Sequence, residues 1–152
     1  MQWPWGNGWV LLLLTVVVLV VLVACTPAVK EKKEQKEYVV TVEGTIMKVL
    51  EDDTDTKGGK HQRLFVRVNK VLDNPEDVRI ERKEDIFVAI RYGDKDGFPQ
   101  RLKELDKGEG KRIEIRGRYI PKEQAVGNEK KSVLHFTHKP VGYIRFDNKT
   151  HR

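Results

Sequence analysis

The sequence predicts a mainly β domain, a small barrel of five strands with one short helix between the third and the fourth strand. Two observations predict it. From Tyr38 onward, apolar and polar residues alternate with a period of two, which is the period of a β-strand. In addition, one short segment of this part has the apolar spacing of a helix, with three strand-like segments before it and two after it.

The first three strands are predicted at residues 38–50, 61–71 and 86–90. The first contains Gly44, where a long strand can bend or form a bulge. The polar segment that follows it, residues 51–60, predicts a turn. In the second strand Leu64, Val66 and Val68 share one face, which indicates that this face is buried.

The helix is predicted over residues 98–105, with Leu102 and Leu105 on one side. The later strands are predicted at residues 111–120 and 132–137, with a last edge segment at 143–146. Three strands, a short helix and two strands are the order of the five-stranded OB-type barrel, so an OB-like fold is expected. An immunoglobulin-like sandwich would need more strands than the sequence contains.

The N-terminal part predicts export and a lipid anchor. An apolar run of about 15 residues, the length of a signal-peptide core, extends from Trp9 to Val23. Ala24 follows it, and then Cys25, the chain's one cysteine. This junction resembles a bacterial lipoprotein signal. The resemblance implies cleavage before Cys25, lipidation of Cys25, and an extracytoplasmic protein anchored to the cell membrane.

Three segments follow from this interpretation. They are a signal segment (1–24), the lipidated cysteine with a charged tether (25–37), and the barrel domain (38–152). An uncleaved membrane anchor is the alternative, because residues 1–8 lack basic side chains and lysines follow the apolar run. The net charge of +6, from 29 basic and 23 acidic residues, lies entirely after the signal. It is mild for so highly charged a chain and does not favour a dedicated nucleic-acid binder, although nucleic acid stays possible.

Three short motifs in the predicted barrel resemble those of a family of small, uncharacterised bacterial proteins. They are His-Gln-Arg at 61–63, His-Phe-Thr-His at 135–138 and Gly-Tyr-Ile at 142–144. The family is a domain of unknown function, so the resemblance implies an OB-like fold and singles out these residues without implying an activity.

Three of the four histidines lie in these motifs: His61, His135 and His138. In an OB barrel the spatial strand order is 1-2-3-5-4, which places the start of strand 2 and the end of strand 5 at the same rim. Three imidazoles there could hold a zinc-like divalent metal whose bound water attacks an ester. Positions 135 and 138 point to opposite faces of a regular strand, so this requires a strand break at Thr137. A structural role for the histidines is the alternative that the sequence favours.

The polar face of the second strand carries His61, Arg63, Phe65 and Arg67, one aromatic ring among basic side chains. OB barrels often use this face to bind chains of nucleotides or sugars, stacking rings on aromatic residues. A solvated face of paired charges is the alternative interpretation.

No catalytic motif is specific enough to name a reaction, and no cofactor is indicated apart from the metal alternative. The sequence therefore favours a membrane-anchored binding or interaction module for an anionic ligand or polymer, or for an envelope protein. Its candidate ligand-binding residues are His61, Arg63, Phe65, Arg67, His135 and His138. A metal-dependent hydrolase and a purely structural envelope protein are the alternatives.

Overall fold

Residues 35–126 and 130–152 are the part of the chain that the computed structural model describes. The predicted signal segment, Cys25 and residues 26–34 of the predicted tether lie outside this part. The compact unit extends from Gln35 to Arg152. Within the described residues, no helix combines the length and the apolar character that crossing a membrane requires.

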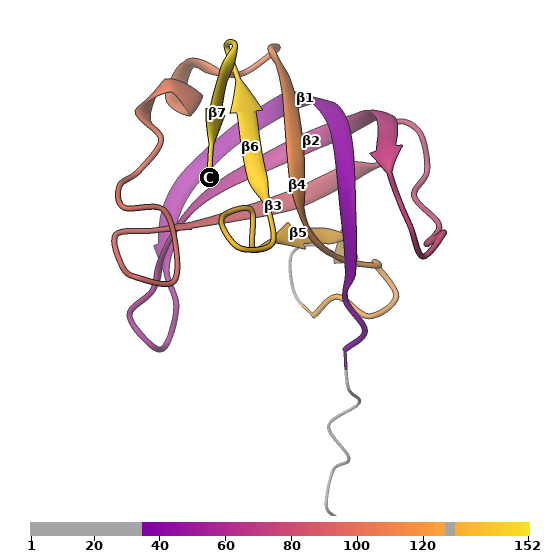
Figure 1. The fold of residues 1–152 in the computed structure, drawn as a ribbon, viewed down its shortest axis with the longest axis horizontal. Coiled ribbons are helices and arrows are strands. Elements are labelled where there is room, and N and C mark those ends of the chain that lie inside the picture. Colours follow the sequence, from indigo (N-terminus) through magenta and orange to yellow (C-terminus); the bar gives the residue numbers. More distant parts are fainter. Residues whose placement is uncertain (1–34, 127–129) are drawn as a thin grey trace, which may run out of the picture. The chain divides into compact units, whose positions relative to one another are not determined.

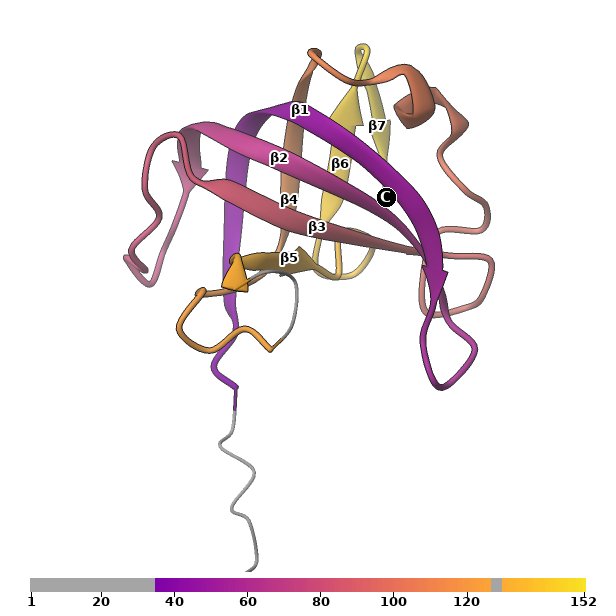
Figure 2. The same cartoon turned by 180° about the vertical axis from the view of Figure 1, so that it is seen from behind.

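The barrel is built from β-strands that are mostly antiparallel (Figure 1). The elements are β1 (Tyr38–Thr54), β2 (Lys60–Asp73), β3 (Asp85–Tyr92), the 3₁₀ helix η1 (Lys103–Lys107), β4 (Arg112–Ile120), β5 (Val133–His135), β6 (Tyr143–Phe146) and β7 (Lys149–His151). The sheet order is β1-β2-β3-β5-β4, and β4 pairs back to β1 and closes the barrel. Strands β3 and β5 are parallel. Figure 2 shows β1, β2 and β3 side by side, with β5 next to β3. This is the predicted order, and the mainly β, OB-like barrel is confirmed.

The core fills the inside of this barrel. Leu64, Val66 and Val68 are at most 1% exposed, as the alternation in β2 predicts. Ile113 and Ile115 in β4 are buried opposite them. In the described part of the chain, the fully buried apolar side chains lie between Val40 and Phe146. The protein comprising residues 26–152 therefore retains the whole core and every strand that closes the barrel.

Strand β1 bends so that it can pair with β2 on one edge and with β4 on the other. The β1–β2 register shifts between Glu43 and Gly44. A Cβ atom at Gly44 would lie 2.6 Å from the carbonyl oxygen of Arg67, so the close approach of the two strands requires glycine. The predicted bend at Gly44 is confirmed.

The helix differs from its prediction, because residues 98–102 are not helical and a 3₁₀ helix lies at Lys103–Lys107. Phe98 lies extended instead, and its N–H donates a hydrogen bond of 2.9 Å to the carbonyl oxygen of Arg91. The Phe98 ring is 3% exposed. Burial of this ring beside β3 outweighs the weak helical pattern of residues 98–102.

The last strand of the barrel is broken into two pieces. Strand β5 pairs with one end of β4, and β6 pairs further along the same edge. The residues between them, 136–142, form a loop that leaves the sheet. The break falls directly after His135, earlier than the predicted Thr137, because Phe136 has a φ of 51°. The sequence also does not predict β7, which turns back from β6 at Asp147 and Asn148, both with positive φ.

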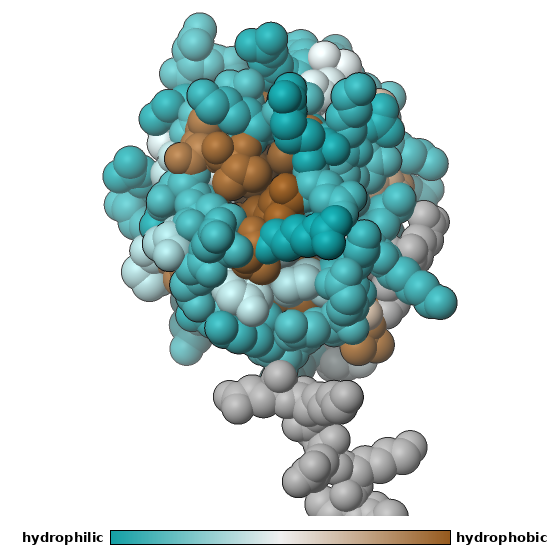
Figure 3. Space-filling view, turned by 90° about the vertical axis from the view of Figure 1, so that its right-hand side faces the viewer, coloured by the Kyte–Doolittle hydropathy of each residue, from teal (hydrophilic) through white to brown (hydrophobic). Residues whose placement is uncertain are grey.

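The connection between β2 and β3 covers another part of the barrel. Val78 and Ile80 of this connection are partly buried and pack against the core. Seen from the side that carries this connection, apolar side chains gather in a hollow surrounded by hydrophilic ones (Figure 3).

Candidate ligand-binding site

A pocket of about 330 Å³ lies on the outer face of the barrel, where β2, β3 and β5 meet the 136–142 loop. We call it the histidine pocket. Its lining residues are Asp55, His61, Phe87, Ala89, Arg91, Val133, His135, Phe136 and His138. The three histidines of the sequence motifs thus surround one pocket, as the strand order predicts.

Strand register explains why these side chains meet. His61 of β2 lies opposite Arg91 of β3. Ala89 and Phe87 lie two and four residues before Arg91 on β3, so their side chains share its face. Phe87 in turn pairs with Val133 across the parallel β3–β5 ladder. Three neighbouring strands therefore present one continuous face to the pocket.

The floor of the pocket is apolar. Phe87, Val133 and Ile120 form a second buried cluster, separate from the barrel core. Phe65 supports this cluster, since its ring meets that of Phe87 edge-on at 5.8 Å between centroids. Phe87 is 8% exposed, so the floor is packed and its shape is set before any ligand arrives.

His135 at one side of the pocket has a carboxylate partner that comes from the predicted tether. The Nε2 atom of His135 lies 3.0 Å from Oε1 of Glu37, and Arg118 donates a hydrogen bond of 2.8 Å to the other Glu37 oxygen. Burial lowers the pKa of His135, although Glu37 opposes this, and Arg118 and His61 add to the lowering. We assign a neutral imidazole near pH 7, whose Nε2 atom lies close to the Glu37 carboxylate without the geometry of a hydrogen bond.

Phe136 forms the exposed wall of the pocket. Its side chain is 39% exposed. The guanidinium carbon of Arg118 lies 4.7 Å from the centre of the Phe136 ring, and the His135 ring lies 4.7 Å away. His138 is buried behind this wall, between Phe136 and Phe98, and its Nδ1 atom is 2.7 Å from the carbonyl oxygen of Lys139.

The opposite side of the pocket is charged. Arg91 donates hydrogen bonds to Asp94, the shortest of 2.7 Å. Asp55 accepts hydrogen bonds of 2.8 Å from the backbone N–H groups of Lys57 and Gly59, and these bonds hold its pKa below the usual value. Both carboxylates therefore already have hydrogen-bond partners.

Arg63 and Arg67 do not line the pocket. Arg67 forms two hydrogen bonds with Asp85, of 2.9 and 3.1 Å, and Arg63 donates to the carbonyl oxygen of Glu51. Phe65 lies beside Phe87 on the same outer face and does not line the pocket either. Of the six predicted ligand-binding residues, the structure brings the three histidines together and leaves Arg63, Phe65 and Arg67 outside.

The metal alternative has no support in the described part of the chain. Residues 35–126 and 130–152 contain no group of three or more His, Cys, Asp or Glu side chains that could hold a metal ion. One nitrogen of His135 faces Glu37 and one of His138 faces a backbone carbonyl, so these two rings are held by the protein. We derive no hydrolytic step through a metal.

Gln62, the middle residue of the His-Gln-Arg motif, has a structural role. It is fully buried, and its side-chain amide donates a hydrogen bond of 3.1 Å to the carbonyl oxygen of Leu102. Arg101 fastens the same loop through ion pairs of 2.6 Å with both Asp52 and Asp106. Gln62 therefore attaches the loop before β4 to the barrel.

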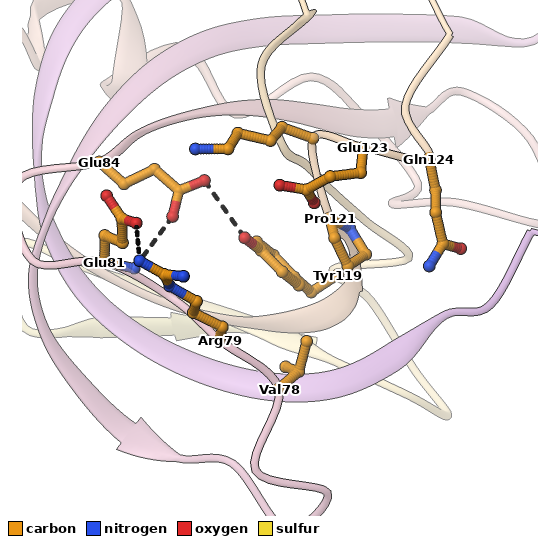
Figure 4. Close-up of a pocket in the computed structure, with 9 residues that line it drawn as sticks. Val78, Arg79, Glu81, Glu84, Tyr119, Pro121, Glu123 and Gln124 are labelled. Atoms are coloured by element: carbon orange, nitrogen blue, oxygen red, sulfur yellow. Dashed lines mark hydrogen bonds and ion pairs between the residues drawn. The ribbon is translucent and has the colours of Figure 1, made fainter.

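A second pocket, of about 400 Å³, lies between the β2–β3 and β4–β5 connections (Figure 4). Tyr119 and Glu84 point toward one another in it, and the Tyr119 hydroxyl is 2.9 Å from Oγ of Ser132 and 3.2 Å from Glu84. Ser132 also donates a hydrogen bond to Glu84. Arg79 pairs with Glu81. The histidine pocket joins the three motif histidines to an apolar floor, so it is the stronger candidate site.

No family model, curated protein or solved structure matches this chain. The resemblance to a family with His-Gln-Arg and His-x-Thr-His motifs therefore stays a prediction.

Proposed function

We propose that the barrel is a binding module and that the histidine pocket takes a small anionic ligand with a flat apolar part. One observation carries this proposal: a single pocket joins an apolar floor to imidazole and guanidinium side chains. Phe87 and Val133 offer surface for the flat part, as small-molecule sites usually do. The His61 imidazole and the Arg91 guanidinium supply hydrogen-bond donors for an anionic group.

The carboxylates around the pocket already have partners, so they oppose an anionic ligand less than free carboxylates would. Asp55 and Asp94 are engaged by backbone N–H groups and by Arg91, and Glu37 is engaged by Arg118. The guanidinium of Arg118 lies next to the pocket, over the ring of Phe136. A lipid head group, an envelope glycan with acidic groups, or a small carboxylate shares the required chemistry.

We further propose that the barrel is exported and lipid-anchored through Cys25. The apolar run, Ala24 and Cys25 support this proposal. Residues 26–37 would then connect the lipid to β1, and fully extended they span at most about 40 Å. The binding module would therefore work close to a membrane surface.

The binding proposal is tested with 2-naphthoate, a flat aromatic carboxylate, titrated into the ¹⁵N-labelled protein of residues 26–152 and followed by NMR. Ala89→Trp fills the pocket from its floor and should weaken binding at least about tenfold, which is 1.4 kcal/mol. Leu72→Trp places the same ring at an exposed position near the end of β2 and is the matched control. Equal affinity in the two variants, or no saturable binding in the parent protein, would overturn the proposal.

A further inference from the structure

The carboxylate of Glu37 already occupies a small anion site beside the histidine pocket. It bridges the guanidinium of Arg118, at 2.8 Å, and the imidazole of His135, at 3.0 Å. Arg118 also covers one face of Phe136, and the ring of His135 lies against the same residue. A guanidinium donor, an imidazole and an aromatic face are thus gathered around one carboxylate, an arrangement suited to carboxylate recognition.

This anion site is continuous with the histidine pocket. His135 and Phe136 belong to both, because they line the pocket and also contact Glu37 or Arg118. A ligand lying on the apolar floor next to Phe87 therefore needs to extend only past His135 to bring an anionic group to Arg118.

Glu37 is placed so that it can be displaced. The β1–β4 ladder begins at Tyr38, so moving Glu37 breaks no pair of the barrel. The residues before it are held through Gln124, which accepts hydrogen bonds of 2.6 Å from the Gln35 side chain and 2.9 Å from the Lys36 N–H. The Glu37 side chain is 27% exposed. The two hydrogen bonds to Gln124 are exposed, where each contributes little to stability, whereas the contacts of the Glu37 carboxylate are partly buried.

We propose that Glu37 is an internal competitor for the ligand of the histidine pocket, and that this ligand is a flat or aromatic carboxylate. The ligand's carboxylate takes the place of the Glu37 carboxylate on Arg118 and His135, and its flat part lies on Phe136 and the apolar floor. This inference rests on the proposed binding function. Ligand binding then releases residues 35–37 from the barrel, which links occupation of the pocket to the segment that leads to Cys25.

Two probes of equal shape test the competition: 2-naphthoate and its neutral analogue 2-naphthamide. Glu37→Gln keeps the size of the side chain and removes the competing charge. It should tighten 2-naphthoate about fivefold and leave 2-naphthamide unchanged. Arg118→Gln should weaken 2-naphthoate to the affinity of the amide. In the parent protein, 2-naphthoate and not 2-naphthamide should shift the amide signals of Gln35 and Lys36.

Asp96→Asn is the matched control for a general effect of charge. Asp96 lies 3.8 Å from Arg91, at the other side of the pocket, and does not contact Arg118. If Asp96→Asn and Glu37→Gln tighten 2-naphthoate equally, the competition is overturned and the binding function stands. If Ala89→Trp does not weaken the binding of either probe, both proposals are overturned.

Discussion

Phe136 has a backbone conformation that side chains with a Cβ atom seldom adopt, with a φ of 51°. Such a conformation persists where other interactions hold it, and unusual residues of this kind gather at binding sites. Here Arg118 and His135 contact its ring from two directions. The ring is therefore fixed over the mouth of the histidine pocket, at the expense of local backbone strain.

Two substitutions separate the ring of Phe136 from its backbone. Phe136→Gly removes the ring and relieves the strain, whereas Phe136→Ala removes the ring and keeps the strain. The glycine variant should be more stable than the alanine variant by about 1 kcal/mol, measured by urea unfolding. Both should bind 2-naphthoate more weakly than the parent protein and to the same degree. If the alanine variant is as stable as the glycine variant, the backbone at position 136 is not strained.

The buried imidazole of His135 should make stability depend on pH. Burial lowers its pKa in the folded protein, against the attraction of Glu37. In the unfolded chain a histidine takes up a proton near pH 6.5, while the folded barrel takes it up at a lower pH. The unfolded state thus binds more protons just below that pH, so stability rises with pH there and is lost as the pH falls.

The urea midpoint of the protein of residues 26–152 should therefore decrease between about pH 7.5 and pH 5.5. His135→Gln cannot take up the proton and should reduce this decrease. Comparable pH dependence in the variant and in the parent protein would assign the effect to other groups.

At the scale of elements, the broken last strand creates the pocket wall. Its loop, residues 136–142, presses onto β4 because two glycines leave room. A Cβ atom at Gly117 would lie 2.5 Å from the carbonyl oxygen of His135. One at Gly142 would overlap the carbonyl oxygen of Arg116 and lie 2.6 Å from that of Phe136. The obstacles are backbone atoms, so they cannot rotate away as a side chain can.

Gly142→Ala should consequently destabilise the barrel by about 2 kcal/mol or more, the effect of overpacking a rigid site. It should also displace Phe136 and His138 and weaken 2-naphthoate binding. Gly58→Asn is the control: its φ is 85°, nothing lies within 4 Å of an added Cβ atom, and asparagine tolerates this conformation. The free energy of unfolding of the control, measured by thermal or urea unfolding, should decrease by at most about 1 kcal/mol. Equal losses in the two variants would contradict a role for close packing at Gly142.

Sequence periodicity could predict the barrel because its strands bury one face and expose the other. Residues 61–71 and 111–120 alternate clearly, and the structure places the apolar residues of one face of each strand inside the barrel. The strand order also places the three histidines around one pocket. The predicted helix begins too early because Phe98 pairs with the end of β3 instead, and the sequence does not predict β7, which is only three residues long.

The rest of the candidate site could not be found in this way. Glu37 lies in a segment without apolar periodicity, and its partners Arg118 and His135 follow far along the chain. Strand β3 is apolar on both faces, so nothing in its pattern shows that Phe87 and Arg91 face a pocket. Arg63 and Arg67 were plausible ligand contacts because ion pairs with neighbouring strands are not visible in one strand alone.

At the scale of the whole molecule, the barrel and its attachment meet at one place. Residues 35–37 are the last part of the predicted tether, and they contact Gln124, Arg118 and His135. The histidine pocket therefore lies near the point where the chain from Cys25 enters the barrel. A ligand presented by a membrane would not need to reach the far side of the domain.

The lipid anchor can be tested in cells that process bacterial lipoproteins. The full chain should incorporate labelled palmitate, lose residues 1–24, and gain the corresponding lipid mass on the peptide that begins at Cys25, measured by mass spectrometry. Cys25→Ser removes the sulfur that accepts the lipid, so label and lipid mass should both disappear. Cys25→Ala is a second variant of nearly equal size and should behave in the same way.

An uncleaved anchor would give a different result. The parent protein and Cys25→Ser would then both remain full-length, carry no lipid, and appear equally in the membrane fraction. In that case residues 30–33 carry the lysines that would hold the segment after the apolar run on the cytoplasmic side.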